Sequence, residues 1–268
     1  MNVFQLTAGE GPLVAAAIHN GHLVRPEVIE LLLLSDAERR REEDPFTDTL
    51  IDWAPTQLVG HRSRFEVDLN RPRDMAIYLT PEQAWGLNVW HTPPVAEVVA
   101  RSLANYDLFY ATAEAVLRRL VATHGRVIVL DVHTYNHRRD GTDGPLADAA
   151  VNPEVNVGTG SMDRARWAPV VDGFLAELAN FDYLGRRLDV RENVKFQGGQ
   201  FCRWIHENFP DSVCAIAVEF KKFFMDEWTG QVDRPQLMKL RAALESTAPR
   251  LLQLLGELHH GASSQHKR

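Results

Sequence analysis

The stretch RVIVLD at residues 126–131 is an apolar run that follows a glycine, Gly125, and ends in a carboxylate. Short apolar runs bounded by turn residues are typical of strands that are buried on both faces. Two further runs have this character, LVAAAI at residues 13–18 and SVCAIAVEF at residues 212–220. Segments with helical periodicity lie between and after them, at residues 95–124, 169–180, 198–208 and 235–259. Strands that alternate with helices predict an α/β fold with three layers (α/β/α) and a mainly parallel central sheet.

The composition limits the class of protein. The chain has 268 residues, of which 45% are hydrophobic and 24% charged, so we expect one globular domain over residues 1–268. The net charge of −7 disfavours nucleic acid as a partner, and no apolar run approaches the roughly 20 residues that span a membrane. Only two cysteines occur, and the first residues do not resemble a secretion signal. We therefore expect a cytoplasmic protein, whose oligomeric state the composition does not reveal.

Polar side chains cluster where the predicted strands end. Residues 64–69 alternate polar and apolar side chains, which predicts one more strand. In an open α/β sheet, ligands bind beyond the carboxyl ends of the strands. We therefore expect the polar residues at these ends to meet in one site; they are His19 and His22, Asn70 and Arg71, His133, and Glu219.

The histidines are candidate metal ligands. Imidazole is a common ligand of zinc, and a catalytic zinc usually has three protein ligands and one open position. His19 and His22 from one turn, together with His133 from another strand, supply that number. The alternative is that His19 and His22 are loop histidines that hydrogen-bond to the backbone. The chain has 11 histidines, so chance pairs are expected, and the metal hypothesis depends on all three side chains meeting.

Asn70 and Arg71 are a candidate anion-binding pair. The guanidinium fork of arginine binds a carboxylate through two parallel hydrogen bonds, and an asparagine amide can donate one more. Arg64 is close enough in sequence to assist. This pattern indicates a substrate that carries a carboxylate. The alternative is a surface ion pair between Arg71 and Asp68 or Asp74.

Glu219 ends an apolar strand, so its backbone is expected to be buried. A buried carboxylate is costly unless it is paired, hydrogen-bonded or close to a metal. In such a place it can accept a proton from water and pass it to a leaving amine. The alternative is an ion pair with Lys221 or with a nearby arginine.

In this order, the four clusters resemble those of the N-formylglutamate amidohydrolase family, which looks like a branch of the zinc carboxypeptidase and aspartoacylase superfamily. The resemblance runs from Val14 to Gly230 and rests on His-x-x-His, Asp-Leu-Asn-Arg, Asp-Val-His-Thr and the late glutamate. It implies a phosphorylase/hydrolase-like fold of the zinc-exopeptidase type, with a mixed sheet between helices. It also implies one zinc ion (Zn2+) per chain, with another divalent metal as the alternative.

The resemblance implies roles for the individual residues. His19 and His133 match zinc ligands of the superfamily. His22 stands where the superfamily has a glutamate, so Glu27 and Glu30 are alternatives for the second ligand. Glu219 and Arg71 are the expected catalytic residues. The expected substrate-binding side chains are Arg64, Asn70 and Arg71, with His137 at the oxyanion and Arg138 or Arg139 at a second carboxylate.

The implied function is metal-dependent hydrolysis of the amide bond of an N-formyl- or N-acyl-amino acid, with a small acidic substrate. The first alternative is a carboxypeptidase-like enzyme that uses the same residues on a short peptide or a peptide-like metabolite. The second is a protein that binds a ligand without activity, which would lack Glu219 or the metal ligands. Because the sequence contains both, it favours an enzyme, but it does not reveal the acyl group or the amino acid.

Overall fold

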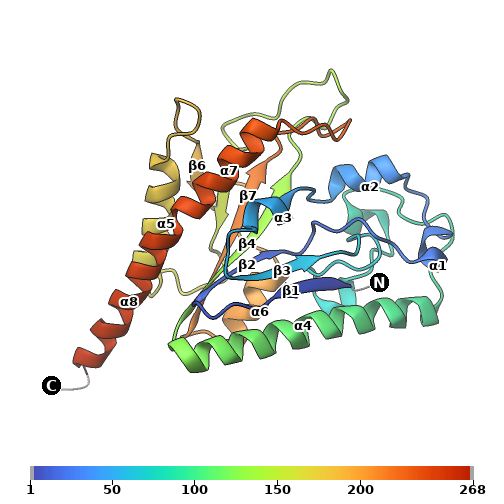
Figure 1. Ribbon diagram of the computed structural model, residues 1–268. Helices are drawn as coiled ribbons and strands as arrows, with labels where there is room; N and C mark the ends of the chain where they lie inside the picture. Colours follow the sequence, from blue (N-terminus) through green and yellow to red (C-terminus); the bar gives the residue numbers. More distant parts are fainter. Residues whose placement is uncertain (1–2, 266–268) are drawn as a thin grey trace.

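The computed structural model describes residues 3–265, and side chains as far as residue 258. The described strands form a seven-stranded sheet with the order β1-β3-β2-β4-β7-β5-β6 (Figure 1). Strand pairs β2–β3, β2–β4, β4–β7 and β5–β6 are parallel, while β1–β3 and β5–β7 are antiparallel. The sheet is thus mixed and mainly parallel. Its strands are β1 (Phe4–Thr7), β2 (Leu13–Ala17), β3 (Thr56–Gly60), β4 (Val127–Tyr135), β5 (Val155–Gly158), β6 (Val190–Glu192) and β7 (Val213–Lys221).

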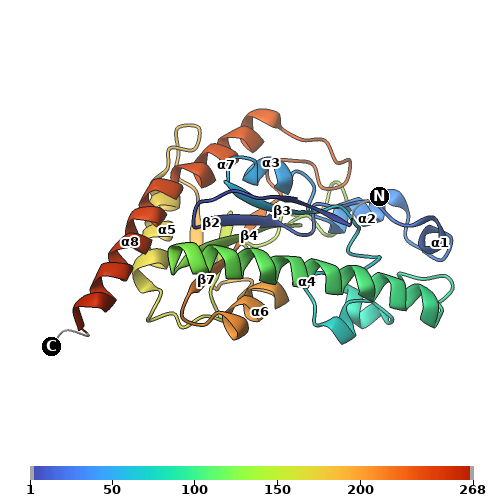
Figure 2. The same ribbon diagram turned by 60° about the horizontal axis from the view of Figure 1, so that its bottom comes forward.

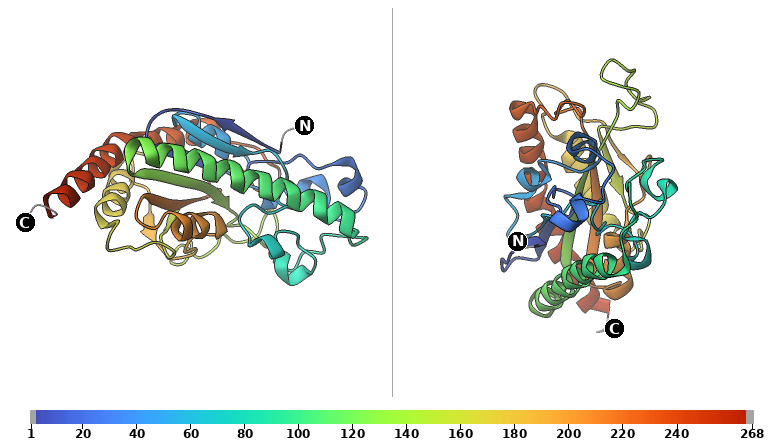
Figure 3. Two further views of the ribbon diagram at one scale, coloured as in Figure 1. Left: turned by 90° about the horizontal axis from the view of Figure 1, so that it is seen from below. Right: turned by 90° about the vertical axis from the view of Figure 1, so that its right-hand side faces the viewer.

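Helices cover both faces of the sheet (Figure 2). One layer contains α4 (Ala96–His124) and α6 (Gln200–Asn208), which lie side by side when the molecule is seen from below (Figure 3, left). The opposite layer contains α3 (Thr47–Ile51), α5 (Ala168–Asn180), α7 (Arg234–Ser246) and α8 (Ala248–Gln265). The short helices α1 (Pro26–Ile29) and α2 (Asp36–Glu42) lie beyond one end of the sheet, and the 3₁₀ turns are η1 (Arg73–Met75) and η2 (Pro81–Ala84). The predicted three-layer α/β/α fold is confirmed.

The central strand β4 is buried on both faces. Ile128, Leu130 and Val132 pack in the core that includes α5, α7 and α8. Val127 and Val129 pack in the core that includes α4 and α6. This packing explains why RVIVL does not alternate between apolar and polar side chains. None of the described helices is long and apolar enough to cross a membrane.

Strands β2, β4 and β7 are parallel neighbours, so their carboxyl ends meet at one edge of the sheet. Strand β4 continues to Tyr135, further than predicted, so that His133 lies within it. His133 is paired in register with Glu219 of β7. His19 lies just after the end of β2. The sheet alone therefore brings His19, His133 and Glu219 together.

Two segments differ from the prediction. Residues 64–69 form turns instead of a strand. Their polar side chains do not face solvent, because Glu66 is 1% exposed and Arg64 pairs with the fully buried Asp68 at 2.9 Å. The alternation therefore reflects buried ion pairs. Residues 235–259 were predicted as one helix but divide into α7 and α8 at Thr247, just before Pro249, which has no N–H to continue the helical bonding.

Candidate metal centre and active site

Three buried side chains converge beyond the carboxyl ends of β2 and β4. His19 follows β2, His133 lies in β4 and Asp44 follows α2, and none is more than 3% exposed. Oδ2 of Asp44 is 2.9 Å from Nδ1 of His133 and 3.5 Å from Nδ1 of His19. One ligand atom from each residue lies within 4.8 Å of the other two. The group is therefore compact enough to hold a single metal ion.

Each histidine has a carboxylate at its other ring nitrogen. Nε2 of His19 is 2.7 Å from Oδ1 of Asp68, and Nε2 of His133 is 3.0 Å from Oδ1 of Asp131. For His19, the Asp68 carboxylate at Nε2 favours the tautomer that carries its proton there, which leaves the Nδ1 lone pair facing Asp44. In that state the Nδ1 lone pair and the Asp44 carboxylate, which are both hydrogen-bond acceptors, face each other at the centre of the group. A bound cation would resolve this conflict, so the donor atoms fit a metal.

The group also carries an excess of buried negative charge. Burial raises the pKa of Asp44, but hydrogen bonds and charge from His133 and His19 outweigh this effect and lower it well below its usual range. Burial lowers the pKa of His133, yet Asp131 and Asp44 raise it well above its usual range. The same carboxylates that favour a protonated imidazole would favour a bound cation. Two imidazoles and a carboxylate are a ligand set that zinc uses in catalytic sites.

The structure does not bring His22 into this group. Nδ1 of His22 is 2.5 Å from Oε2 of Glu43, and its Nε2 is 2.5 Å from Oδ1 of Asp36. Both ring nitrogens therefore have carboxylate partners elsewhere. The chain turns after β2 and is not helical between His19 and His22, so it lacks the helical spacing that would place both side chains on one face.

The alternatives for the second ligand, Glu27 and Glu30, also lie outside the group. Glu27 belongs to α1 and forms two ion pairs with arginines, each at 3.3 Å. Glu30 directly follows α1 and is exposed. Asp44 therefore takes the place of His22, Glu27 and Glu30 in the candidate ligand set.

Asn70 is held by the start of α6. Its Oδ1 accepts a hydrogen bond from the backbone N–H of Phe201 at 2.9 Å, and its own backbone N–H donates to Oδ1 of Asp68 at 2.7 Å. Because the amide oxygen is used, Nδ2 points the other way and lies 3.3 Å from Nε2 of His133. Gly199 permits this close approach, since a Cβ there would lie 2.3 Å from the Asn70 amide. Asn70 thus presents an N–H donor beside the histidines.

Arg71 and Arg64 line the same cavity but differ in their partners. Among the described residues Arg71 forms no ion pair, and its guanidinium carbon lies 5.9 Å from the centre of the Tyr78 ring. Within the described residues Arg71 therefore does not form the alternative ion pair with Asp68 or Asp74. Arg64 donates to Asp68 at 2.9 Å, to the Tyr78 hydroxyl at 3.2 Å and to the carbonyl oxygen of Glu42 at 3.3 Å. Arg71 is free to bind an anion, whereas Arg64 is committed to protein groups.

These side chains line a cavity of about 490 Å³, here called the active-site cavity. Glu219 lines it beside His133, and burial raises the pKa of Glu219 to about 7 against the opposing charge of His133. Within residues 3–258, no hydrogen bond or ion pair holds its carboxylate. Lys221, the partner considered as the alternative, donates instead to the carbonyl oxygen of Asn152 at 2.7 Å. The Glu219 carboxylate is therefore available to exchange a proton with a group in the cavity.

His137 and Arg138 lie in a neighbouring cavity of about 380 Å³ rather than in the active-site cavity. Their backbone N–H groups donate to the carboxylate of Glu227 at 2.7 and 3.2 Å, which turns the chain away after β4 ends. The guanidinium of Arg138 donates to the carbonyl oxygen of Thr142 at 2.7 Å. On this loop Arg139, not Arg138, lines the active-site cavity.

A family model described as N-formylglutamate amidohydrolase matches residues 11–225. The chain belongs to the N-formylglutamate amidohydrolase family. N-formylglutamate deformylase of Pseudomonas aeruginosa is 27% identical over 245 residues, which cover 84% of this chain and 86% of that protein. The resemblance found in the sequence is thus confirmed.

Two crystal structures share the fold. An N-formylglutamate amidohydrolase from Ralstonia eutropha JMP134 aligns with a TM-score of 0.73 and 16% identity, covering 97% of this chain and 100% of the other. A gene product of Agrobacterium tumefaciens aligns with a TM-score of 0.68 and 15% identity, covering 95% and 96%. At these identities the two structures support the fold alone.

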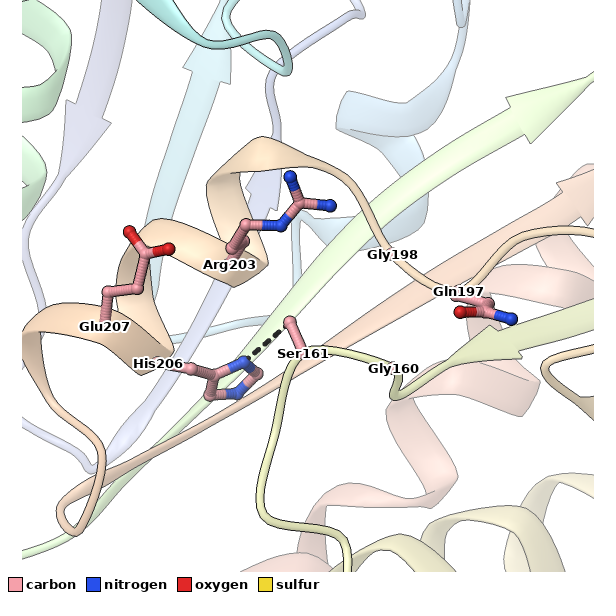
Figure 4. Close-up of a pocket in the computed structure, with 7 residues that line it drawn as sticks. All are labelled: Gly160, Ser161, Gln197, Gly198, Arg203, His206 and Glu207. Carbon is pink, nitrogen blue, oxygen red and sulfur yellow. Dashed lines mark hydrogen bonds between the residues drawn. The ribbon is translucent and has the colours of Figure 1, made fainter.

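This member of the N-formylglutamate amidohydrolase family has a further, smaller cavity of about 240 Å³, which shares Gln197 and Gly198 with the active-site cavity (Figure 4). In it, Oγ of Ser161 lies 2.8 Å from Nδ1 of His206, a pairing that resembles a nucleophile and its base. The backbone N–H of Ala215 donates to Nε2 of His206 at 3.1 Å, and burial lowers the pKa of His206 to about 4. The neutral ring therefore carries its proton on Nδ1 and donates to Ser161. In this tautomer His206 has no free nitrogen to accept the Ser161 proton.

Asp44 and Lys195 line the active-site cavity but were not among the residues predicted from sequence. Asp44 is the third of three consecutive acidic residues, and nothing local distinguishes it from Glu42 and Glu43. Lys195 lies in a segment without periodicity. The glycine pair after it, at residues 198–199, is a signal of close backbone approach that could have indicated this part of the site.

The placement of His22 predicts its titration. Burial favours the neutral ring, but the hydrogen bonds that the ring donates to Glu43 and Asp36, together with the charge of Glu43, outweigh burial and raise the pKa of His22 above 6.5. We expect the Cε1–H resonance of His22 in NMR to titrate above pH 6.5, with the same midpoint after zinc is added. Asp36→Asn should lower that midpoint, because one carboxylate charge is lost. Loss of the titration on zinc addition would instead identify His22 as a ligand.

Proposed function

We propose that this chain is a metal-dependent amidohydrolase, acting as a single domain, that cleaves the amide bond of an N-formyl- or N-acyl-amino acid with an acidic side chain. One observation carries the proposal: the unpaired Glu219 carboxylate lines the same cavity as the His19, Asp44 and His133 group and the free Arg71. The name of the Pseudomonas aeruginosa relative supports N-formylglutamate as the first substrate to test.

In this proposal His19, Asp44 and His133 hold one divalent cation. Zinc suits two imidazoles and one carboxylate with an open position, while geometry and availability decide between zinc and other divalent metals. When bound, the cation supplies Lewis-acid chemistry that polarises the acyl carbonyl and lowers the pKa of water. Asp68 and Asp131 keep the two rings oriented through their Nε2 atoms.

Glu219 acts first as general base and then as general acid. It takes a proton from the water that attacks the acyl carbon, and it returns this proton to the amide nitrogen as the C–N bond breaks. The products are a carboxylic acid, which is formate for an N-formyl substrate, and the free amino acid. The absence of an ion pair among the described residues leaves the carboxylate of Glu219 free for both transfers.

Two groups of cationic and amide side chains bind the carboxylates of the substrate. The guanidinium fork of Arg71, with Nδ2 of Asn70, binds the α-carboxylate. Arg139 and Lys195 bind the side-chain carboxylate. Burial and the charge of Arg139 both lower the pKa of Lys195, so the two cations repel each other. Among the described residues, the only carboxylate in contact with these two cations is Glu42, at 3.7 Å from Arg139. An anion bound between Arg139 and Lys195 would relieve their repulsion.

The metal assignment predicts the metal content of variants. Protein purified without chelator should contain about one zinc ion per chain, and His19→Ala, His133→Ala and Asp44→Ala should each lose it. His22→Ala is the matched control and should retain the metal, because its ring is bound to Glu43 and Asp36. Elemental analysis measures the content. Metal retained by Asp44→Ala and lost by His22→Ala would reverse the ligand assignment.

The role of Glu219 predicts a loss of turnover without a loss of metal. Glu219→Gln keeps the side-chain shape but cannot accept a proton, so kcat for N-formyl-L-glutamate should fall at least about 100-fold. Formate release and elemental analysis are measured on the same preparation. Ser161→Ala, the control in the smaller cavity, should leave kcat unchanged. Full activity in Glu219→Gln would exclude this mechanism.

The second cationic pair predicts substrate selectivity. Lys195→Met or Arg139→Met should lower kcat/KM for N-formyl-L-glutamate by roughly 10- to 100-fold, because each removes a charged hydrogen bond to the side-chain carboxylate. Hydrolysis of N-formyl-L-methionine should be unaffected, and Arg138→Met is the control from the neighbouring cavity. Equal losses on both substrates would count against this role. Glycyl-L-glutamate belongs in the same panel, since faster cleavage of this peptide would favour the carboxypeptidase-like alternative.

A further inference from the structure

The helix α2 ends two residues before the candidate ligand Asp44. The last carbonyl groups of a helix have no partner within it and need donors from elsewhere. Nζ of Lys222 donates to the carbonyl oxygens of Arg41 and Glu43 at 2.6 and 2.8 Å. Arg64 donates to the carbonyl oxygen between them at 3.3 Å. Two cations thus hold three consecutive carbonyl groups and offset the partial negative charge of the helix end.

Lys222 is buried, with 1% of its surface exposed, and a buried ammonium is unfavourable unless its donors are satisfied. Its third donor binds Oδ1 of Asn136 at 2.9 Å, so the three hydrogen bonds use all its N–H groups. Its backbone N–H donates to the carbonyl oxygen of Tyr135 at 3.0 Å. Lys222 therefore joins the ends of β4 and β7 to the end of α2.

We infer that Lys222 is a positioning residue of the metal site, which places the Asp44 carboxylate against His19 and His133 by holding the end of α2. The inference rests on the proposed function, because it takes Asp44 as a metal ligand. Glu219 lies three residues before Lys222, near the end of the same strand. The end of β7 thus fixes the position of Glu219, the proposed proton carrier, and through Lys222 the position of the loop that carries Asp44.

Further contacts hold Asp44 directly, among them a hydrogen bond of 2.7 Å from the hydroxyl of Thr47 to the carbonyl oxygen of Asp44. Its backbone N–H donates to the carbonyl oxygen of His19 at 3.0 Å, and its Oδ1 accepts from the hydroxyl of Thr134 at 3.2 Å. The N–H contact fixes only the peptide group that joins Glu43 to Asp44, while the carbonyl groups of residues 41–43 are held by Lys222 and Arg64. Without Lys222 we expect a site that still binds metal, but more weakly, because part of the binding free energy is spent on ordering the loop.

Lys221 provides a matched control. It has the same charge, precedes Lys222 directly and donates to the carbonyl oxygen of Asn152 at 2.7 Å, in a different loop. It does not line the active-site cavity. Lys221→Met therefore removes a lysine from the same strand end without touching α2.

The test compares wild type, Lys222→Met and Lys221→Met after the metal has been removed from each. The dissociation constant for zinc is measured by competition with a chromophoric chelator, and the Tm of each metal-free protein is measured separately. Lys222→Met should raise the dissociation constant about 10- to 100-fold, the effect typical of residues that orient ligands, while Lys221→Met should not. A role in stability alone would lower the Tm of the metal-free protein and leave the zinc affinity of the folded protein unchanged.

A folded Lys222→Met protein with wild-type zinc affinity would overturn the inference. If this variant does not fold, Asn136→Ala decides the question, because it removes one acceptor of the ammonium and leaves the helix carbonyls in place. Asn136→Ala should weaken zinc binding in the same direction, and an unchanged dissociation constant would overturn the inference. A wild-type protein that binds no zinc would overturn the proposed metal site itself, and this inference with it.

Discussion

The contact of the Asp44 carboxylate with Nδ1 of both His19 and His133 is the constraint on which the rest of the site depends. It joins three side chains that are almost without solvent, and carboxylates behind the rings add further negative charge. Buried charges of one sign are tolerated only where opposite charge is close. The two histidines and Arg64 supply part of that charge, and a divalent cation at the centre of the group would supply the remainder.

The sheet positions the two histidines of this contact, and a loop positions Asp44. Parallel pairing of β2, β4 and β7 brings His19, His133 and Glu219 to one edge, and the pairing of His133 with Glu219 places the candidate ligand beside the proposed base. Asp44 comes from outside the sheet, so its position has to be fixed separately. The buried contacts at the end of α2 have this effect, which explains why a lysine is buried where the sheet ends.

Of the residues predicted from sequence, His19, His133 and Glu219 reach the active-site cavity because their position follows from the sheet, whereas Arg64, Asn70 and Arg71 reach it from turns. Apolar runs identified β2, β4 and β7, and the polar residues at their ends therefore converged. The short strands β1, β3, β5 and β6 carry too few residues to show a period, and they were not predicted. His137 and Arg138 follow β4 but turn away because Glu227, 90 residues later, binds their backbone. Such a contact leaves no local pattern.

The second candidate metal ligand is another residue that no local sequence pattern identifies. His22 has the expected spacing from His19, yet the turn between them is not helical, and two carboxylates hold its ring elsewhere. Asp44 lies 25 residues after His19 and becomes a candidate only when α2 returns to the sheet. Spacing predicts metal ligands within one regular element, where backbone geometry fixes direction. It does not predict a ligand that a loop carries in from a distance.

The cations at the site divide into two kinds by their partners. Lys222 is buried and Arg64 is partly buried, with 13% of its side chain exposed, and both donate to groups of the protein, so they compensate internal acceptors. Arg71 and Lys195 line the same cavity without an ion pair among the described residues, and Arg139 has only the contact of 3.7 Å with Glu42. A protein with a net charge of −7 thus keeps three cations around one cavity, and the charge of Arg139 disfavours the protonated form of Lys195. An anion bound between Arg139 and Lys195 would offset this repulsion, which supports the proposed substrate with more than one carboxylate.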